Sequence, residues 1–184
     1  MPPHNPGPPH NSAPPDHTIA AGRPSPAGFA EALSAWPGAV CLVTIADGRD
    51  DIGTTVSAFC PVSVSPPLVL VSLIAESYPA EVLQRSDAFA VTILSAGQRV
   101  LAGRFAAAGR PGARLLLENV PHRRGAVSGA LIPEGGLAAF ECEVTTFIPA
   151  GDHLLLVARV LAVPYVAEAS EPLIRFRGRY LGPR

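Results

Sequence analysis

Apolar and polar positions alternate along much of the chain in short runs, which is the pattern of β-strands with one buried face. Strands are predicted at residues 39–46, 52–59, 62–65, 68–73, 89–94, 137–147 and 153–163. Asp47-Gly48 and the polar residues after it predict a hairpin turn between the first two strands. Many strands at short spacing predict a mainly β protein, with an antiparallel barrel as its architecture.

Helical spacing is limited to short stretches. One helix is predicted from apolar residues that would share a face, namely Phe29, Ala32, Leu33 and Trp36. Two more short helices are predicted at residues 79–85 and 96–105. Residues 106–136 are rich in Gly, Arg and Pro, so we expect a long excursion with little regular structure, of a kind that is often functional. Residues 173–180 alternate apolar and basic positions and indicate a short edge segment.

Residues 1–26 differ in composition from the rest of the chain. Nine of the 21 prolines fall there, and proline removes backbone donors while the few apolar side chains cannot offset the entropy of ordering. We therefore expect a disordered Pro-rich tail at 1–26 and one domain at 27–184. The scattered His4, His10 and His17 are expected to be solvated, and no metal site is predicted.

Charge and cysteine content exclude several classes of function. The net charge is −1 and no basic stripe occurs, so a nucleic-acid partner is not expected. No apolar run is long enough to cross a bilayer, and no secretory signal is evident, so no membrane partner is expected either. The three cysteines are widely separated, which favours a reducing compartment. These features together predict a soluble, cytoplasmic protein.

The segment from Gly53 to Phe59 is rich in small hydroxyl residues, which a β protein without a ligand would not need. A glycine opens a row of small hydroxyl residues, and an apolar, β-branched run follows at residues 62–71. Backbone and side-chain hydroxyl groups can both approach a flat polar ligand here, with a rigid wall behind it. The pattern predicts a cofactor-binding site.

Taken in order, the motifs of this chain resemble the flavin reductase-like family. They are Trp36-Pro37-Gly38-Ala39-Val40, the segment 53–59, residues 62–69, Phe89-Ala90-Val91, Leu101-Ala102 with Arg104-Phe105, residues 140–144, Gly151-Asp152-His153, and Arg177-Gly178-Arg179-Tyr180. The resemblance covers roughly residues 27–182. It implies an FMN-binding split β-barrel, antiparallel and Greek-key-like, with a few short helices.

The resemblance also implies an activity. Family members are homodimers that hold flavin in a groove at the subunit interface and transfer a hydride from NADH or NADPH to FMN or FAD. Many of them supply reduced flavin to a separate flavin-dependent monooxygenase. The resemblance places the ring and ribityl chain of the flavin along Thr54, Thr55, Val56, Ser57 and Ala58.

Other site residues follow from the same resemblance, each with a structural alternative. His153 is implied at the nicotinamide, where it would orient the ring; the alternative is a surface turn residue. Arg104 and Phe105 are implied near the flavin, where an arginine suits phosphate; the alternative is a C-terminal helix arginine. Arg177 and Tyr180 are implied beside the pyridine nucleotide, and the alternative is a solvated edge strand.

The chain departs from the family pattern at residues 74–79, where the family usually has a polar Arg/Asn-Ser-Ser-x-Thr segment for the flavin phosphate. Glu76 would bring a carboxylate to that neighbourhood and repel an anion, and Ser77 would keep one contact at a helix start. Cys60 is expected in the core, although a position near the flavin would let it tune the cofactor.

Two other functions remain open at this stage. A barrel with a reworked phosphate segment would bind another ligand or catalyse a biosynthetic tailoring reaction. A dimeric scaffold subunit would recruit a partner through its Pro-rich tail.

Overall fold

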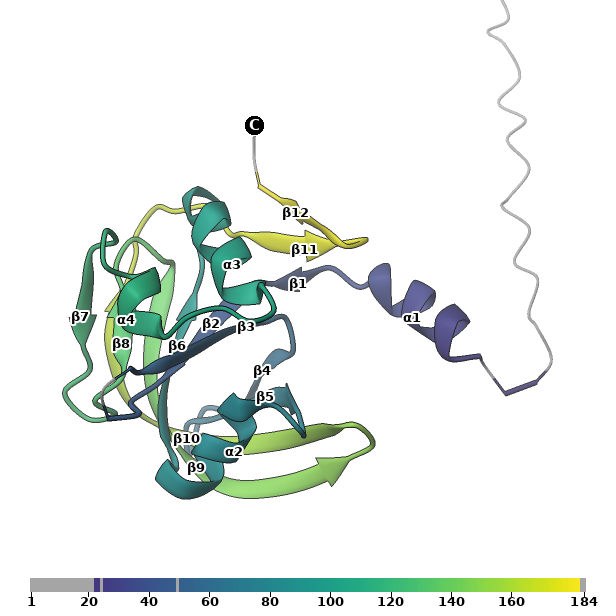
Figure 1. The fold of residues 1–184 in the computed structure, drawn as a ribbon, viewed down its shortest axis with the longest axis horizontal. Helices are drawn as coiled ribbons and strands as arrows, with labels where there is room; N and C mark the ends of the chain where they lie inside the picture. Colours follow the sequence, from purple (N-terminus) through teal and green to yellow (C-terminus); the bar gives the residue numbers. More distant parts are fainter. Residues whose placement is uncertain (1–21, 24, 49, 183–184) are drawn as a thin grey trace, which may run out of the picture.

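The computed structural model describes residues 22–23, 25–48 and 50–182. Within these residues a seven-stranded antiparallel sheet has the strand order β3-β2-β6-β9-β10-β5-β4 (Figure 1). The strands are β2 (Cys41–Ile45), β3 (Ile52–Val56), β4 (Phe59–Ser63), β5 (Leu68–Ile74), β6 (Ala88–Ile93), β9 (Ala138–Ala150) and β10 (His153–Val166). The sheet curls so that β3, at one end of this order, also contacts β5. The predicted antiparallel barrel is confirmed.

The main core lies inside this curled sheet. Alternate residues of β5 are buried, which places Val69, Val71 and Leu73 against Phe89 of β6 and Leu156 of β10. Burial of such side chains contributes on the order of 1.5–3 kcal/mol each. The period-two pattern that predicted the strands is therefore the pattern that fills the barrel.

A second core lies on the outer side of β2 and carries most of the helices. It includes Leu42, Leu101, Phe105 and Leu173. The elements around it are η1 (Ala96–Gln98), α3 (Arg99–Ala106), α4 (Ala113–Leu116) and a small sheet of β1 (Gly38–Ala39), β11 (Ile174–Phe176) and β12 (Arg179–Leu181). The predicted edge segment at 173–180 is thus a hairpin that pairs with β1. Helix α2 (Tyr78–Ser86) packs on the other side of β3 from α3 (Figure 1).

The expectation of little regular structure at residues 106–136 is wrong in part. The segment contains α4 and a two-stranded sheet of β7 (His122–Arg124) and β8 (Leu131–Pro133). Distant residues hold it in place. The carboxylate of Glu141 accepts hydrogen bonds from the backbone of Val127 and Ser128, and Asp51 forms ion pairs with Arg114 and Arg124. These long-range contacts have no local sequence pattern.

Helix α1 (Pro26–Ser34) begins at the last residue that was assigned to the Pro-rich tail, and Ser25 caps it. It stands away from the barrel, and none of its residues is buried (Figure 1). The predicted apolar face is therefore open, with Leu33 54% and Trp36 76% exposed. Residues 1–21 and 24 lie outside the described residues, so the Pro-rich tail and its scaffold role stay predictions. None of the helices in the described ranges is long and apolar enough to cross a membrane.

Candidate functional site

The site begins at β3, which stands at one end of the strand order with an open edge. The carbonyl of Gly53 accepts a hydrogen bond of 2.7 Å from Nε of Arg110, so this carbonyl points away from β2. Backbone groups alternate between the two edges of a strand. The N–H and C=O of Thr55 therefore point toward the same open side, where no strand of the described residues pairs with them.

A groove of about 300 Å³ follows this open edge, within the size range of small-molecule and cofactor sites. We call it the β3 groove. It is lined by Thr54, Thr55, Val56, Ser57, Ala58, Ser72, Leu73, Ile74, Ser77, Arg110 and His153. Hydroxyl groups gather along one strand, and the apolar end of β5 lies opposite them. The predicted segment 54–58 and the predicted Ser77 and His153 thus share one cavity.

A second hollow of about 520 Å³ shares residues 54–57, Arg110 and His153 with the β3 groove and extends to Arg175 and Tyr180. The structure therefore brings Tyr180 close to the same cavity. Arg177 lies elsewhere, in a hollow that it shares with Trp36 and Ser57, and its guanidinium stacks over the ring of Phe176 at 5.4 Å.

His153 is the first residue of β10 and lies opposite Ile74 at the end of β5. Its Nδ1 lies 2.7 Å from Oδ1 of Asp152, which fixes the direction of the imidazole. This hydrogen bond lowers the pKa of Asp152 below its usual value. Because the side chain is 40% exposed and faces the groove, it is placed to contact a ligand.

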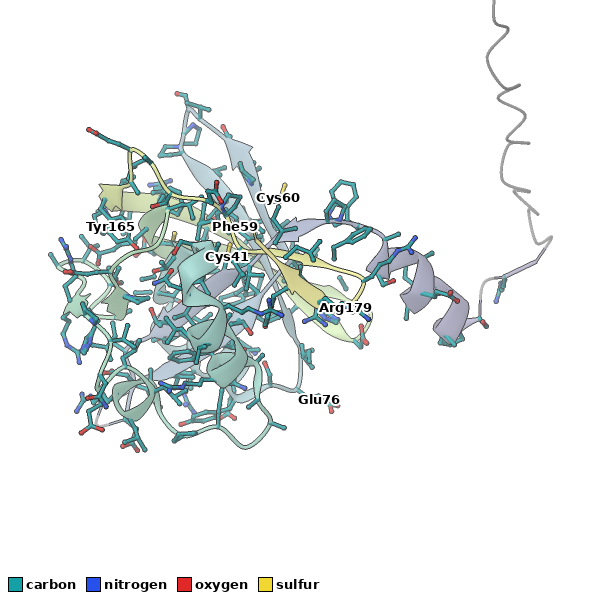
Figure 2. The ribbon with its side chains drawn as sticks, turned by 90° about the horizontal axis from the view of Figure 1, so that it is seen from above. Cys41, Phe59, Cys60, Glu76, Tyr165 and Arg179 are labelled. Carbon is teal, nitrogen blue, oxygen red and sulfur yellow. The ribbon has the colours of Figure 1, made fainter. Side chains whose placement is uncertain are left out.

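The segment predicted for the phosphate holds one residue that is engaged in a helix cap and one that lies away from the groove. Ser77 caps α2: its Oγ donates to the carbonyl of Ile74 at 2.7 Å and accepts from the N–H of Ala80 at 3.4 Å. Glu76 is exposed and does not line the β3 groove, and Figure 2 shows its side chain projecting away from the body of the molecule. The expected repulsion between Glu76 and a bound anion therefore loses its geometric basis.

The predicted pair Arg104 and Phe105 does not reach the groove. Phe105 is fully buried beneath β3 in the second core, where its ring lies against Gly53. Arg104 is exposed on the face of α3 that points away from this core. Helical geometry explains both positions, since Leu101 and Phe105, four residues apart, bury one face and leave the adjacent position outside.

Two further positions differ from expectation. Cys60 is exposed on β4, so its predicted place in the core is wrong. β4 is the other end strand of the sheet, and all of its residues from Cys60 to Val62 are exposed. Sequence reasoning also missed Arg110, which lines both hollows. The nearby glycines Gly109 and Gly112 indicate a loop at Arg110. They do not indicate a site residue, because its hydrogen-bond partner Gly53 lies 57 residues away in the chain.

Comparison with known proteins gives a consistent result. The family model of the flavin reductase like domain matches residues 33–183. The chain is 34% identical over 152 residues to the NADH-dependent FMN reductase AsuE2 of Streptomyces nodosus subsp. asukaensis, covering 83% of this chain and 82% of that protein. It is 33% identical to the reductase component of 4-hydroxyphenylacetate 3-monooxygenase from Thermus thermophilus, and the match covers 83% of this chain and 93% of that protein.

Solved structures of flavin reductases also superpose on this chain. BorF, the flavin reductase component of a bacterial two-component tryptophan halogenase, superposes with a TM-score of 0.78 at 29% identity, covering 84% of this chain and 95% of that chain. The NADH:FAD oxidoreductase SgcE6 of Streptomyces globisporus, in complex with NAD and FAD fragments, gives a TM-score of 0.77 at 28% identity, covering 84% and 90%.

Proposed function

The chain belongs to the flavin reductase-like family, and from this membership we infer that it is a flavin reductase, which transfers a hydride from NADH or NADPH to FMN or FAD. One observation carries the inference: the residues that match the family model build the β3 groove, with its open strand edge and its hydroxyl groups. Two of the relatives named above are reductase components of larger systems, one of a 4-hydroxyphenylacetate 3-monooxygenase and one of a two-component tryptophan halogenase. We assign this chain the same relation to a monooxygenase, to which it would supply reduced flavin.

The residues of the groove fit a flavin. The pyrimidine edge of the ring presents N–H and C=O groups, which match the open backbone N–H and C=O of Thr55 and the hydroxyls of Thr54 and Ser57. Leu73 and Ile74 offer an apolar surface for the ring. Thr54, Thr55 and Ser57 would hold the flavin, which would supply the hydride acceptor, and their N–H and O–H donors would favour the negative charge that reduction creates.

His153 and Tyr180 orient the nicotinamide in this proposal. Both line the larger hollow, and the hydrogen bond to Asp152 holds the imidazole in one direction. Hydride transfer requires close stacking of two rings rather than a strong acid or base, so the contribution of His153 is one of position. Arg177 lies in the adjoining hollow, within reach of a more distant part of the dinucleotide.

We propose further that the active form is a homodimer. Helix α1 exposes Phe29 and Leu33, and Trp36 just beyond the end of the helix is exposed as well. An exposed apolar face of this kind is typical of an interface. The hollow beside it borders Ser57 and Ala58, so a second subunit docked on α1 would lie next to the β3 groove.

We place the activity in the cytoplasm, because Cys41, Cys60 and Cys142 are all free, which is usual in a reducing compartment. The domain assignment at 27–184 also belongs to this proposal, and the matched residues 33–183 support it.

The test mixes the purified protein with NADH or NADPH and with FMN or FAD in the absence of oxygen. We expect the flavin absorption band at about 450 nm to bleach in at least one combination, with matching loss of NADH or NADPH absorption. Nucleotide oxidation that requires added flavin supports the assignment. No oxidation with any of the four combinations contradicts it.

A further inference from the structure

Arg110 is a half-buried cation beside the β3 groove that none of the motifs accounts for. It lies in the loop between α3 and α4, and it lines both the groove and the larger hollow. Its Nε donates to the carbonyl of Gly53 at 2.7 Å, and its Nη1 donates to the carbonyl of Ala107 at 3.3 Å. These two bonds hold the plane of the guanidinium in one orientation.

The guanidinium of Arg110 is not paired with a carboxylate in the part of the chain that the structure describes. None of the ion pairs within the described ranges includes Arg110, and its Nη2 makes no hydrogen bond to any of the residues described there. Burial lowers the pKa of Arg110 with no opposing interaction from an acidic group. A partly desolvated guanidinium with free donors is unfavourable by itself and is well suited to bind an anion.

The loop that carries Arg110 is fixed at both ends. On one side, Phe105 anchors α3 in the core against Gly53. On the other side, the N–H of Ala113 donates to the carbonyl of Asp51 at 3.0 Å, and Nε of Arg114 forms an ion pair with the Asp51 carboxylate at 2.9 Å. The position of Arg110 is therefore built by the fold.

The surrounding charges decide on which side an anion binds. Beyond Arg110 lies a hollow lined by Asp47, Asp50 and Asp51, which disfavours an anion there. On the groove side the lining contains no carboxylate among the described residues, and its other polar groups are hydroxyls, including that of Ser77 before α2, and the imidazole of His153. Arg110 and Ser77 both lie where the groove and the acidic hollow meet.

We propose that Arg110 binds the phosphate of the flavin, in place of the arginine that is missing from residues 74–79. The inference rests on the proposed function, and it names the residue and the chemical group through which the site selects a phosphorylated flavin. The phosphate monoester of FMN and the pyrophosphate of FAD share this chemistry.

The experiment compares FMN with riboflavin, which has the same ring and ribityl chain but no phosphate. Dissociation constants are measured by quenching of flavin fluorescence, with oxidised flavins and without NADH. We expect the wild type to bind FMN at least tenfold more tightly than riboflavin. Arg110→Gln should weaken FMN binding about tenfold to a hundredfold and change riboflavin binding less than about twofold.

Two variants bracket this result. Arg110→Lys keeps the charge but loses the forked geometry, so it should retain part of the preference for FMN. Arg99→Gln removes the same charge from an exposed position at the start of α3 and should leave both constants unchanged. If Arg110→Gln does not fold, the salt dependence of the two dissociation constants is measured on the wild type. A steeper loss of affinity with salt for FMN than for riboflavin supports the proposal, and an equal loss for both flavins overturns it.

The other outcomes separate this inference from the proposed function. An equal loss of FMN and riboflavin binding in Arg110→Gln would show that Arg110 supports the ring or the strand, and it would overturn the phosphate role alone. The same follows if the wild type does not prefer FMN, or if Arg104→Gln and not Arg110→Gln abolishes the preference. A wild type that binds no flavin and oxidises no NADH would remove the proposed function and this inference together.

Discussion

Gly53 is the residue at which the groove and the second core meet. Its carbonyl holds Arg110, while the position of a Cβ would fall against the ring of Phe105, 2.7 Å from Cδ1. Because Phe105 is fully buried, its ring has no room to move aside. The glycine therefore lets β3 and α3 approach closely enough to position the loop that carries Arg110.

The substitution Gly53→Ala should destabilise the protein by about 1–3 kcal/mol, since it overpacks a filled core. It should also weaken FMN binding, because β3 and Arg110 move apart. Gly103→Ala is the matched control: it lies in α3 with no atom within 4 Å of the new methyl, so helix propensity predicts a gain of up to about 1 kcal/mol. Urea unfolding measures both, and equal stability of the two variants would contradict the packing argument.

His153 allows a second prediction at this scale. If it orients the nicotinamide, His153→Ala should raise KM for NADH by about tenfold while the dissociation constant for FMN stays within about twofold of the wild type. Because proton transfer is not its role, the variant should keep the pH profile of kcat. Steady-state kinetics at several pH values check this, and a lost pH dependence would instead identify His153 as an acid or base.

At the scale of elements, Asp51 joins the hairpin between β2 and β3 to the segment that follows α3. Its side chain is 1% exposed and forms ion pairs with Arg114 and Arg124 at 2.9 and 2.8 Å. Burial alone would raise the pKa of Asp51, but hydrogen bonds from Arg124, Arg114 and the backbone of Asp47 outweigh burial and lower it.

A lowered pKa fixes the sign of the pH dependence. The charged form of Asp51 stabilises the fold above its unfolded pKa of about 3.8, and this contribution is lost as the pH falls through the folded value. Asp51→Asn should therefore cost on the order of 1–3 kcal/mol at pH 7, and the difference from the wild type should shrink below pH 4. Urea unfolding at pH 7 and pH 3 measures it. Glu81→Gln, which breaks an exposed pair with Arg85, should cost under about 0.5 kcal/mol at either pH.

The long strands and the helices α1, α2 and α3 were predictable because their patterns are local. The alternate residues of the predicted strand 68–73 are the residues of β5 whose side chains are buried in the core. The elements between residues 113 and 133 were not predictable, because each is three or four residues long and depends on Asp51 or Glu141. The hydroxyl segment of the site was predicted from its sequence, whereas Arg110 was not, since its position depends on a carbonyl 57 residues away.

At the scale of the whole molecule, the open face of α1 leads to a prediction about assembly. Leu33→Asp should weaken dimerisation at least tenfold, because it places a charge in an apolar contact. Leu115→Asp is the control: Leu115 is also an exposed leucine, but it lies on α4, on the opposite side of the barrel from α1 (Figure 1). Sedimentation velocity over a range of concentrations measures both variants. A dimer that resists Leu33→Asp would exclude this face of α1 as the interface.

The open edge of β3 has a consequence for handling the protein. Unpaired strand edges template the addition of other chains, and natural proteins limit this hazard with short edge strands and charged neighbours. β3 is five residues long and Arg110 lies across its edge, but the N–H and C=O of Thr55 remain available. A flavin in the groove would cover this site, and each release of the product would uncover it. We therefore expect flavin-free stocks to turn turbid on storage before flavin-loaded ones, which light scattering would detect.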